Sequence, residues 1–187
     1  MAAILPEVTE IPHHYPDCCL SISTRLLQRL GLLQPPESTV ISIGSGSGFL
    51  EALLQRRFPE IRVIGLEVNG SINKYLLPEN AISVKGTWDI YDRSSKADTW
   101  LFVYPRSPIL ISHYLKLSEV PRTVVWLGPK RDWEDFRPPF LDFGTFDVEE
   151  VEDSGVASYE TMVVLKKEDV ISLKNASSLS MSQIDAI

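Results

Sequence analysis

Apolar and polar residues follow one another along this chain in blocks whose spacing changes from block to block. Apolar residues three or four positions apart are typical of one helix face, and they predict helices over 19–33, 49–58, 71–80, 109–117 and 132–140. Short β-branched or continuously apolar runs predict strands over 38–43, 61–68, 81–86, 97–105 and 122–130. The helix over 71–80 is broken by Pro78, and the short helix within 132–140 is expected to end before the double proline at 138–139. Strands that alternate with helices are typical of a doubly wound, mostly parallel sheet with helices on both faces.

The last third of the sequence departs from this alternation. Two strand-like runs within 145–167 flank Asp153-Ser154-Gly155 with no helix between them, which predicts an antiparallel hairpin. The arm from Met162 to Leu165 is continuously apolar, so we expect this strand to be buried on both faces, inside the sheet. Residues 168–187 are rich in serine and have no clear period, which predicts a partly disordered tail.

Length, composition and charge narrow the class of protein. A chain of 187 residues, with 44% hydrophobic and 23% charged residues, is typical of a single globular domain. Its 25 acidic and 18 basic residues give a net charge of -7, which disfavours a protein that binds nucleic acid through its phosphates. Because no apolar run could span a bilayer and the N-terminus lacks a secretory pattern, we expect no membrane contact and a cytoplasmic location, with the nucleus also open.

The two cysteines of the chain, Cys18 and Cys19, are adjacent in the sequence. Neighbouring cysteines rarely form a disulfide, and no matching Cys or His spacing accompanies them, so we predict neither a disulfide nor a metal site. We expect them to begin the first helix, for which Ser21 or Ser23 is available as the N-cap.

Residues 44–48, Gly-Ser-Gly-Ser-Gly, follow a predicted strand and open a predicted helix, and we call them the glycine turn. Glycines let a ligand approach the backbone closely, and free N–H groups at a helix start favour a carboxylate or phosphate. The dinucleotide pattern G-x-G-x-x-G would need a third glycine at position 49, which is Phe49. The spacing therefore disfavours NAD. Glu67, at the end of the next strand, stands where an acidic residue accepts hydrogen bonds from ribose hydroxyls in doubly wound nucleotide sites.

These features together resemble the class I S-adenosylmethionine-dependent methyltransferases. The resemblance covers 38–167 and is carried by the segment VISIGSGSG, by Glu67, by ISVKGTWD and by the final hairpin. It implies a seven-stranded sheet with the last strand antiparallel between the fifth and sixth, in one compact domain. It also implies that 1–37 form an N-terminal segment and helix that cover the cofactor cleft.

The resemblance further implies S-adenosylmethionine as cofactor and assigns residues to its parts. The glycine turn would lie along the methionine part, Glu67 would hold the ribose, and Trp88 and Asp89 would contact the adenine. The cofactor-binding candidates are Gly44, Ser45, Gly46, Gly48, Glu67, Trp88 and Asp89. Tyr104 falls at the end of the fourth strand, where the methyl acceptor is positioned, and would either bind the acceptor or cover the adenosyl group. His14, in the N-terminal segment, is a candidate base, and an ordinary exposed loop histidine is the alternative.

Two positions depart from the family's pattern. The acidic residue usual two positions before the first glycine is replaced by Ser42, so one contact to the methionine end of the cofactor is weaker or comes from elsewhere. The stretch at Tyr104 is not the Asn/Asp-Pro-Pro-Tyr motif of amino-group methylases.

The function that the resemblance implies is methyl transfer from S-adenosylmethionine, with a small molecule or a protein favoured over nucleic acid as acceptor. Ser42 and the short fourth connection over 91–96 support an alternative, a methyltransferase-like binding or scaffold module without transfer activity. A nicotinamide-dependent reductase is a second alternative, which Phe49 and the final hairpin disfavour.

Overall fold

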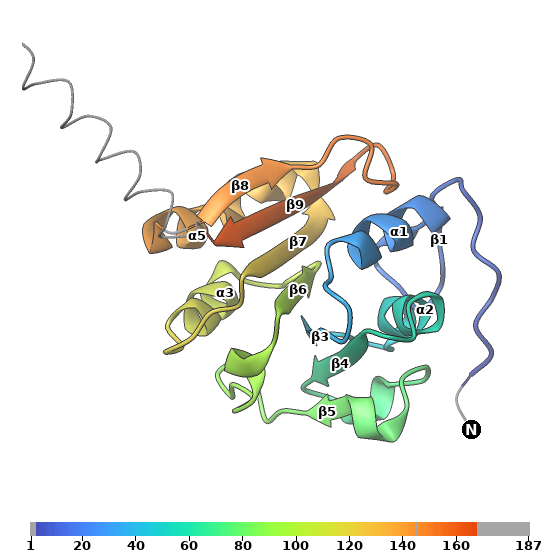
Figure 1. Cartoon of the computed structure of the whole chain (residues 1–187), viewed down its shortest axis with the longest axis horizontal. Helices are drawn as coiled ribbons and strands as arrows, with labels where there is room; N and C mark the ends of the chain where they lie inside the picture. The colour runs from blue at the N-terminus through green and yellow to red at the C-terminus, as the bar shows by residue number, and fades with distance from the viewer. Residues whose placement is uncertain (1–2, 145, 168–187) are drawn as a thin grey trace, which may run out of the picture.

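A mixed sheet forms the centre of the computed structural model, which describes residues 3–144 and 146–167 (Figure 1). The sheet has seven strands in the order β5-β4-β3-β6-β7-β9-β8. Their bounds are β3 Thr39–Ile43, β4 Arg62–Glu67, β5 Ala81–Ser83, β6 Thr99–Val103, β7 Thr123–Pro129, β8 Phe146–Glu150 and β9 Glu160–Lys167. Strands β3 to β7 pair in parallel, whereas β9 is antiparallel to both of its neighbours, β7 and β8. The predicted fold class, including the inserted final strand, is confirmed.

The position of β9 follows from its composition. Its central residues, Met162 to Leu165, are all at most 1% exposed, as expected for a strand with a helix layer on each face. Strand β8 carries alternating exposed residues and forms the edge of the sheet. The order of the strands reverses between β3 and β6, and ligands of open α/β sheets bind outside the carboxyl ends of the strands at such a point.

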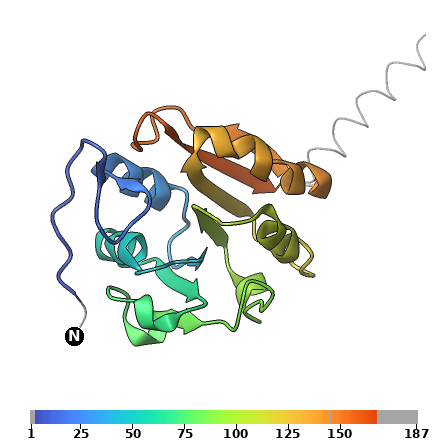
Figure 2. The same ribbon diagram turned by 180° about the vertical axis from the view of Figure 1, so that it is seen from behind.

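Two layers of helices cover the sheet, as Figures 1 and 2 show from opposite sides. Helices α1 Thr24–Leu32 and α2 Phe49–Arg57 lie on one face, and α3 Pro108–Leu115, α4 Trp133–Phe136 and α5 Pro138–Phe143 lie on the other. Successive strand residues point to opposite faces, so Val40 packs in the core with α1 and α2 while Ile41 packs in the core with α3 and α5.

The first helix begins later than its apolar spacing predicts. Ser23 is its N-cap and accepts a hydrogen bond from the Leu26 N–H at 3.1 Å, so one of the two predicted caps is confirmed. Upstream of the cap, β2 Ser21–Ile22 pairs with β1 His13–His14. Cys18 and Cys19 therefore lie in the loop before β2, and the prediction that they begin a helix is wrong.

Two other predicted helices also differ. Residues 71–80 form two separate 3₁₀ turns, η1 Gly70–Ile72 and η2 Pro78–Asn80, because Asn69 caps the first and Pro78 starts the second. The double proline at 138–139 opens α5, where a missing N–H costs nothing, and 130–136 form the 3₁₀ turn η4 Lys130–Asp132 followed by α4. The short 3₁₀ turn η3 Ser94–Lys96 confirms that the fourth connection is too short for a full helix.

The N-terminal segment, defined here as residues 3–23, lies along α2 and crosses toward β9 (Figure 1). Arg56 of α2 donates hydrogen bonds to the carbonyl oxygens of Leu5 and Pro6, and the Ser21 N–H donates to Glu160. No helix in the described residues has the length and apolarity to cross a membrane. The predicted tail over 168–187 lies outside the described residues.

Candidate functional site

A cavity of about 760 Å³ opens at the carboxyl ends of β3, β4 and β6, where the strand order reverses. Most of the residues singled out from the sequence line it, namely Gly44, Ser45, Gly46, Glu67, Trp88, Asp89 and Tyr104. Gly48 and His14 do not line it. Parallel strands bring their carboxyl ends to one edge of the sheet, which is why residues up to 60 positions apart in the sequence meet here.

The glycine turn presents bare backbone to this cavity. Gly44 and Gly46 have φ angles of 81° and 56°, in the left-handed region that favours glycine. A Cβ at either position would have no neighbour within 4 Å, so a ligand can lie directly against this backbone. Gly48, in contrast, faces the protein, since a Cβ there would lie 2.8 Å from Asn73 Oδ1.

The amide groups of the turn are bound by the protein itself. The N–H groups of Gly44 and Ser45 donate to the Leu66 carbonyl oxygen at 2.8 and 3.0 Å. The Gly46 N–H donates to Glu67 Oε2 at 2.9 Å. The sequence predicts that a carboxylate binds at this turn, and the carboxylate found there is that of Glu67. Its hydrogen bond connects the turn to the end of β4. Glu67 Oε1 also accepts hydrogen bonds from the Val68 N–H at 2.8 Å and the Asn69 N–H at 3.4 Å. Since a carboxylate has about four acceptor positions, Glu67 keeps capacity for roughly one further hydrogen bond.

A second carboxylate, which the sequence reasoning missed, lies beside the end of β3. Glu51 of α2 lines the cavity, is 2% exposed, and accepts a hydrogen bond from the Ser42 hydroxyl at 2.5 Å. Burial raises the pKa of Glu51 to about 7; the Ser42 hydrogen bond opposes this, and the nearby Glu67 charge adds to it. Its signal in the sequence was an acidic residue among the apolar residues of the helix directly after the turn.

Trp88, the aromatic candidate, lies after β5 and lines the cavity. Trp88 is 72% exposed, and its ring lies against Gly86, where a Cβ would be 2.6 Å from the ring. Asp89 closes the same loop, because its Oδ2 accepts a hydrogen bond from the Lys85 N–H at 2.7 Å. Trp88 thus offers an open aromatic face, and Asp89 a carboxylate that is held in place.

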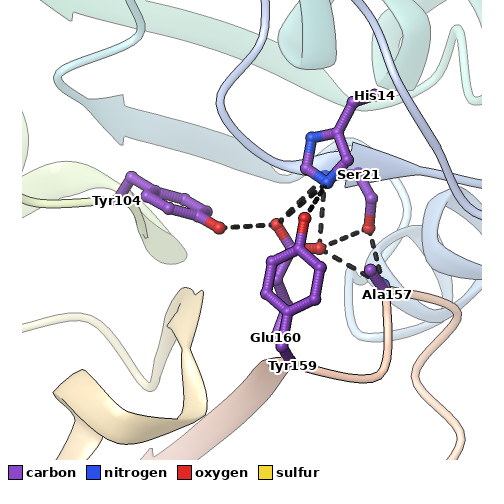
Figure 3. A network of polar contacts seen from close by, with 6 residues as sticks. All are labelled: His14, Ser21, Tyr104, Ala157, Tyr159 and Glu160. Carbon is purple, nitrogen blue, oxygen red and sulfur yellow. Dashed lines mark hydrogen bonds and ion pairs between the residues drawn. The ribbon is translucent and has the colours of Figure 1, made fainter.

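Tyr104 forms the wall at the end of β6. Its φ of 47° is unusual for a residue other than glycine, and such strain is often found at functional sites. Its hydroxyl donates to Glu160 Oε1 at 2.6 Å (Figure 3). Burial and the Glu160 carboxylate raise the pKa of Tyr104 far above its ordinary value of 10, so the phenol stays protonated and is no base at neutral pH.

Glu160 is the centre of this network, and it too was missed from the sequence. It is 1% exposed and accepts hydrogen bonds from the Ser21 N–H and hydroxyl and from the Ala157 N–H, as Figure 3 shows. These donors come from β2 and from the loop between β8 and β9, which are more than 130 residues apart. The carboxylate therefore joins the N-terminal segment, the final hairpin and Tyr104.

His14 lies at the outer side of the same network. Its Nε2 is 3.8 Å from Glu160 Oε1 and contacts the Tyr159 hydroxyl, and its ring stacks on that of Tyr159 with centroids 6.0 Å apart. The side chain is 43% exposed and stands behind Glu160, outside the residues that line the cavity. Its role as a base stays a prediction.

The composition of the cavity suits a positively charged, partly apolar ligand. The lining carboxylates are those of Asp17, Glu51, Glu67 and Asp89, and the lining cations are Lys85 and Arg106, so acidic groups prevail. Apolar side chains, including Leu66, Val84 and Leu110, form much of the remaining wall. S-Adenosylmethionine, with its sulfonium, its ammonium and its flat adenine, fits this combination of bare backbone, carboxylates and an open aromatic face.

Comparison with known proteins supports the fold. No family model and no curated protein match the sequence. Among solved structures, a precorrin-6y C5,15-methyltransferase from Geobacter metallireducens matches with a TM-score of 0.62 and 13% identity, over 87% of this chain and all of that one. The S-adenosylmethionine-dependent methyltransferase SibL matches with a TM-score of 0.55 and 18% identity, over 76% of this chain. Human N-acetylserotonin methyltransferase, solved in complex with S-adenosylmethionine, matches with a TM-score of 0.56 and 11% identity, over 78% of this chain.

This chain spans 55% of the length of SibL and 51% of the human enzyme. The likeness lies in the arrangement of the strands and helices, since the identities are low. The chain has the fold of the class I S-adenosylmethionine-dependent methyltransferases.

Proposed function

We propose that this protein is an S-adenosylmethionine-dependent methyltransferase whose cofactor binds in the cavity at the ends of β3, β4 and β6. The observation that carries the proposal is that the open glycine turn, Glu67 and Trp88 line one cavity at the point where the strand order reverses. Fold alone does not imply activity, and it is the residues lining this cavity that favour S-adenosylmethionine as the ligand.

Different residues of the cavity bind different parts of the cofactor. The bare backbone at Gly44 and Gly46 accommodates the methionine part, Glu67 accepts hydrogen bonds from ribose hydroxyls, and Trp88 and Asp89 bind the adenine. When bound, the cofactor supplies a methyl group on a sulfonium that is already a good leaving group. The protein then has mainly to align the acceptor and exclude water.

The N-terminal segment contributes to that exclusion. Asp17, Cys18 and Cys19 of this segment line the cavity. Asp17 accepts hydrogen bonds from Lys74 Nζ at 2.5 Å and from the Tyr75 hydroxyl at 2.8 Å. The Ser47 hydroxyl of the glycine turn donates to the Asp17 carbonyl oxygen at 2.7 Å, so the covering segment is joined to the turn itself.

For the acceptor we favour a small molecule or a protein over nucleic acid. The net charge of -7 and the predominance of carboxylates around the cavity oppose a polyanion. The acceptor approaches beside Tyr104, whose neutral hydroxyl is fixed by Glu160 and can orient it by a hydrogen bond.

Calorimetric titration with S-adenosylmethionine and S-adenosylhomocysteine tests the proposal. We expect binding to the wild type, weaker binding to Glu67→Ala and Gly46→Val, and wild-type binding to Glu60→Gln, which changes an exposed carboxylate away from the cavity. Absence of binding to the wild type at a cofactor concentration of about 1 mM would rule the proposal out. Transfer of a tritium-labelled methyl group into a cell extract, separated into protein, nucleic acid and small molecules, then identifies the acceptor class.

A second candidate is a cofactor-binding module without transfer activity. It is favoured by one observation: the described residues lining the cavity include no histidine, and the phenol of Tyr104 is already engaged by Glu160. The two functions separate in the assays above, because the module binds S-adenosylhomocysteine but gives no labelled product.

A further inference from the structure

The carboxylate of Glu51 is buried at the cavity wall without a cation to balance it. It is 2% exposed, and no lysine, arginine or histidine of the described part of the chain forms an ion pair with it. Its hydrogen bond comes from Ser42, a neutral hydroxyl on β3 that is itself fully buried. Burying a carboxylate is costly unless a positive group or several donors accompany it.

The groups around Glu51 add to the unbalanced negative charge. The titratable groups that face it from neighbouring elements are Glu67 at the end of β4 and the Cys18 thiol of the N-terminal segment. Glu67 repels a negative charge on Glu51, and burial keeps Cys18 protonated by raising its pKa to about 12. Neither Glu51 nor Glu67 forms an ion pair with a lysine, arginine or histidine of the described residues, so a positively charged group of a bound ligand can balance them.

The position of Glu51 indicates which part of the ligand carries the positive charge. Glu51 is hydrogen-bonded to Ser42 of β3 and lines the same cavity as the bare backbone of Gly44. Trp88 follows β5, which is two strands away from β3 in the sheet. If the aromatic end of the ligand lies at Trp88, the group at Glu51 is the opposite, aliphatic end. A primary ammonium is small enough for this corner and donates up to three hydrogen bonds, which a carboxylate and a hydroxyl can accept.

We propose that Glu51, oriented by Ser42, binds the ammonium group of the cofactor's methionine part and selects for cofactors that carry this amino-acid end. The inference rests on the proposed function, since it assumes that S-adenosylmethionine occupies the cavity. Ser42 then has a definite role: it holds a carboxylate that reaches the site from α2 rather than from β3.

A pH dependence follows from the same geometry. Glu51 binds an ammonium only when it is ionised, and its pKa of about 7 means that it gains its charge across the neutral range. The affinity for S-adenosylhomocysteine should therefore rise between about pH 6 and pH 7.5, and Glu51→Gln should remove this rise.

The test compares two ligands that differ in the amino-acid end, S-adenosylhomocysteine and 5′-methylthioadenosine, by calorimetry on the full chain. In Glu51→Gln, which keeps an oxygen for the Ser42 hydrogen bond, we expect S-adenosylhomocysteine to bind about 10- to 100-fold more weakly, as for loss of a charged hydrogen bond. The affinity for 5′-methylthioadenosine should match that of the wild type. Glu60→Gln is the matched surface control and should leave both affinities unchanged.

A relocated carboxylate gives an independent check. In the double variant Ser42→Asp with Glu51→Ala, the negative charge moves from α2 to β3. The single variant Glu51→Ala should bind S-adenosylhomocysteine weakly, and we expect the double variant to recover most of the lost affinity. Circular dichroism and the unfolding midpoint establish that each variant is folded before it is titrated.

The inference is overturned if Glu51→Gln binds S-adenosylhomocysteine as tightly as the wild type. It is also overturned if both ligands lose affinity in parallel, because Glu51 would then only support the packing of α2. These outcomes differ from failure of the proposed function, in which the wild type itself binds neither ligand.

Discussion

Replacing Glu51 by Gln should stabilise the fold at neutral and alkaline pH, although we expect it to weaken cofactor binding. Burial raises the pKa of Glu51 from 4.5 to about 7, so the native state binds this proton more tightly than the unfolded chain does. The stability associated with the protonated carboxyl is fully present below about pH 4.5 and is lost as the pH rises through 7. At about 1.4 kcal/mol per unit of pKa, the loss amounts to roughly 3 kcal/mol.

Glutamine has the shape of a protonated glutamate and does not titrate. We therefore compare the free energy of unfolding of Glu51→Gln with that of the wild type at two pH values. The difference in favour of the variant should be larger at pH 8 than at pH 4.5 by roughly 3 kcal/mol, because of the raised pKa. Urea unfolding, followed by tryptophan fluorescence and extrapolated linearly at each pH, measures this difference. The reasoning is refuted if the two proteins show the same pH dependence of stability. Glu60→Gln, at an exposed position, should follow the wild type throughout.

Further predictions concern other parts of the site. Tyr104→Phe removes one donor to the buried Glu160 carboxylate and should lower the free energy of unfolding by about 1.5 kcal/mol; an unchanged urea midpoint would mean that this hydrogen bond contributes nothing. Asp17→Asn weakens the attachment of the N-terminal segment to Lys74 and Tyr75, so amide hydrogens of 3–19 should exchange faster, and equal protection would contradict this. Trp88 is the exposed one of four tryptophans, so S-adenosylhomocysteine should quench and blue-shift the emission of the wild type but not of Trp88→Phe, and an equal change in both would place the ligand elsewhere.

The buried acid has a wider meaning for this protein. Functional sites often hold groups that destabilise the fold, because their charge is needed for a ligand. Glu51 meets this description: an amide at this position would suit the native state better at neutral pH, yet only a carboxylate can balance an ammonium. Opposite effects of one substitution on stability and on binding would distinguish such a residue from one that merely packs.

Much of the architecture follows from local patterns in the sequence. The alternation of apolar runs with amphipathic segments predicts a doubly wound sheet, and the continuous run from Met162 to Leu165 predicts that the last strand lies inside it. The positions of the glycine turn and of Glu67 at the cavity can also be predicted from the sequence. Positive φ angles favour glycine, and parallel strands end at the same edge of the sheet. Helix starts are less well determined, since Ser21–Ile22 pair with residues upstream instead of joining α1.

The parts that only the tertiary structure decided are contacts between residues far apart in the chain. Glu160 receives hydrogen bonds from Ser21, 139 positions away, and from Tyr104, 56 positions away, and no local period signals such a partner. Glu51 looked like an ordinary helix residue until the packing of α2 against β3 placed it on Ser42. The sequence by itself determined the layers and most of the predicted residues that line the cavity, because these depend on periodicity and turn chemistry. The charge balance and the hydrogen bonding of the site were decided by the fold, because they depend on which distant side chains share one buried space.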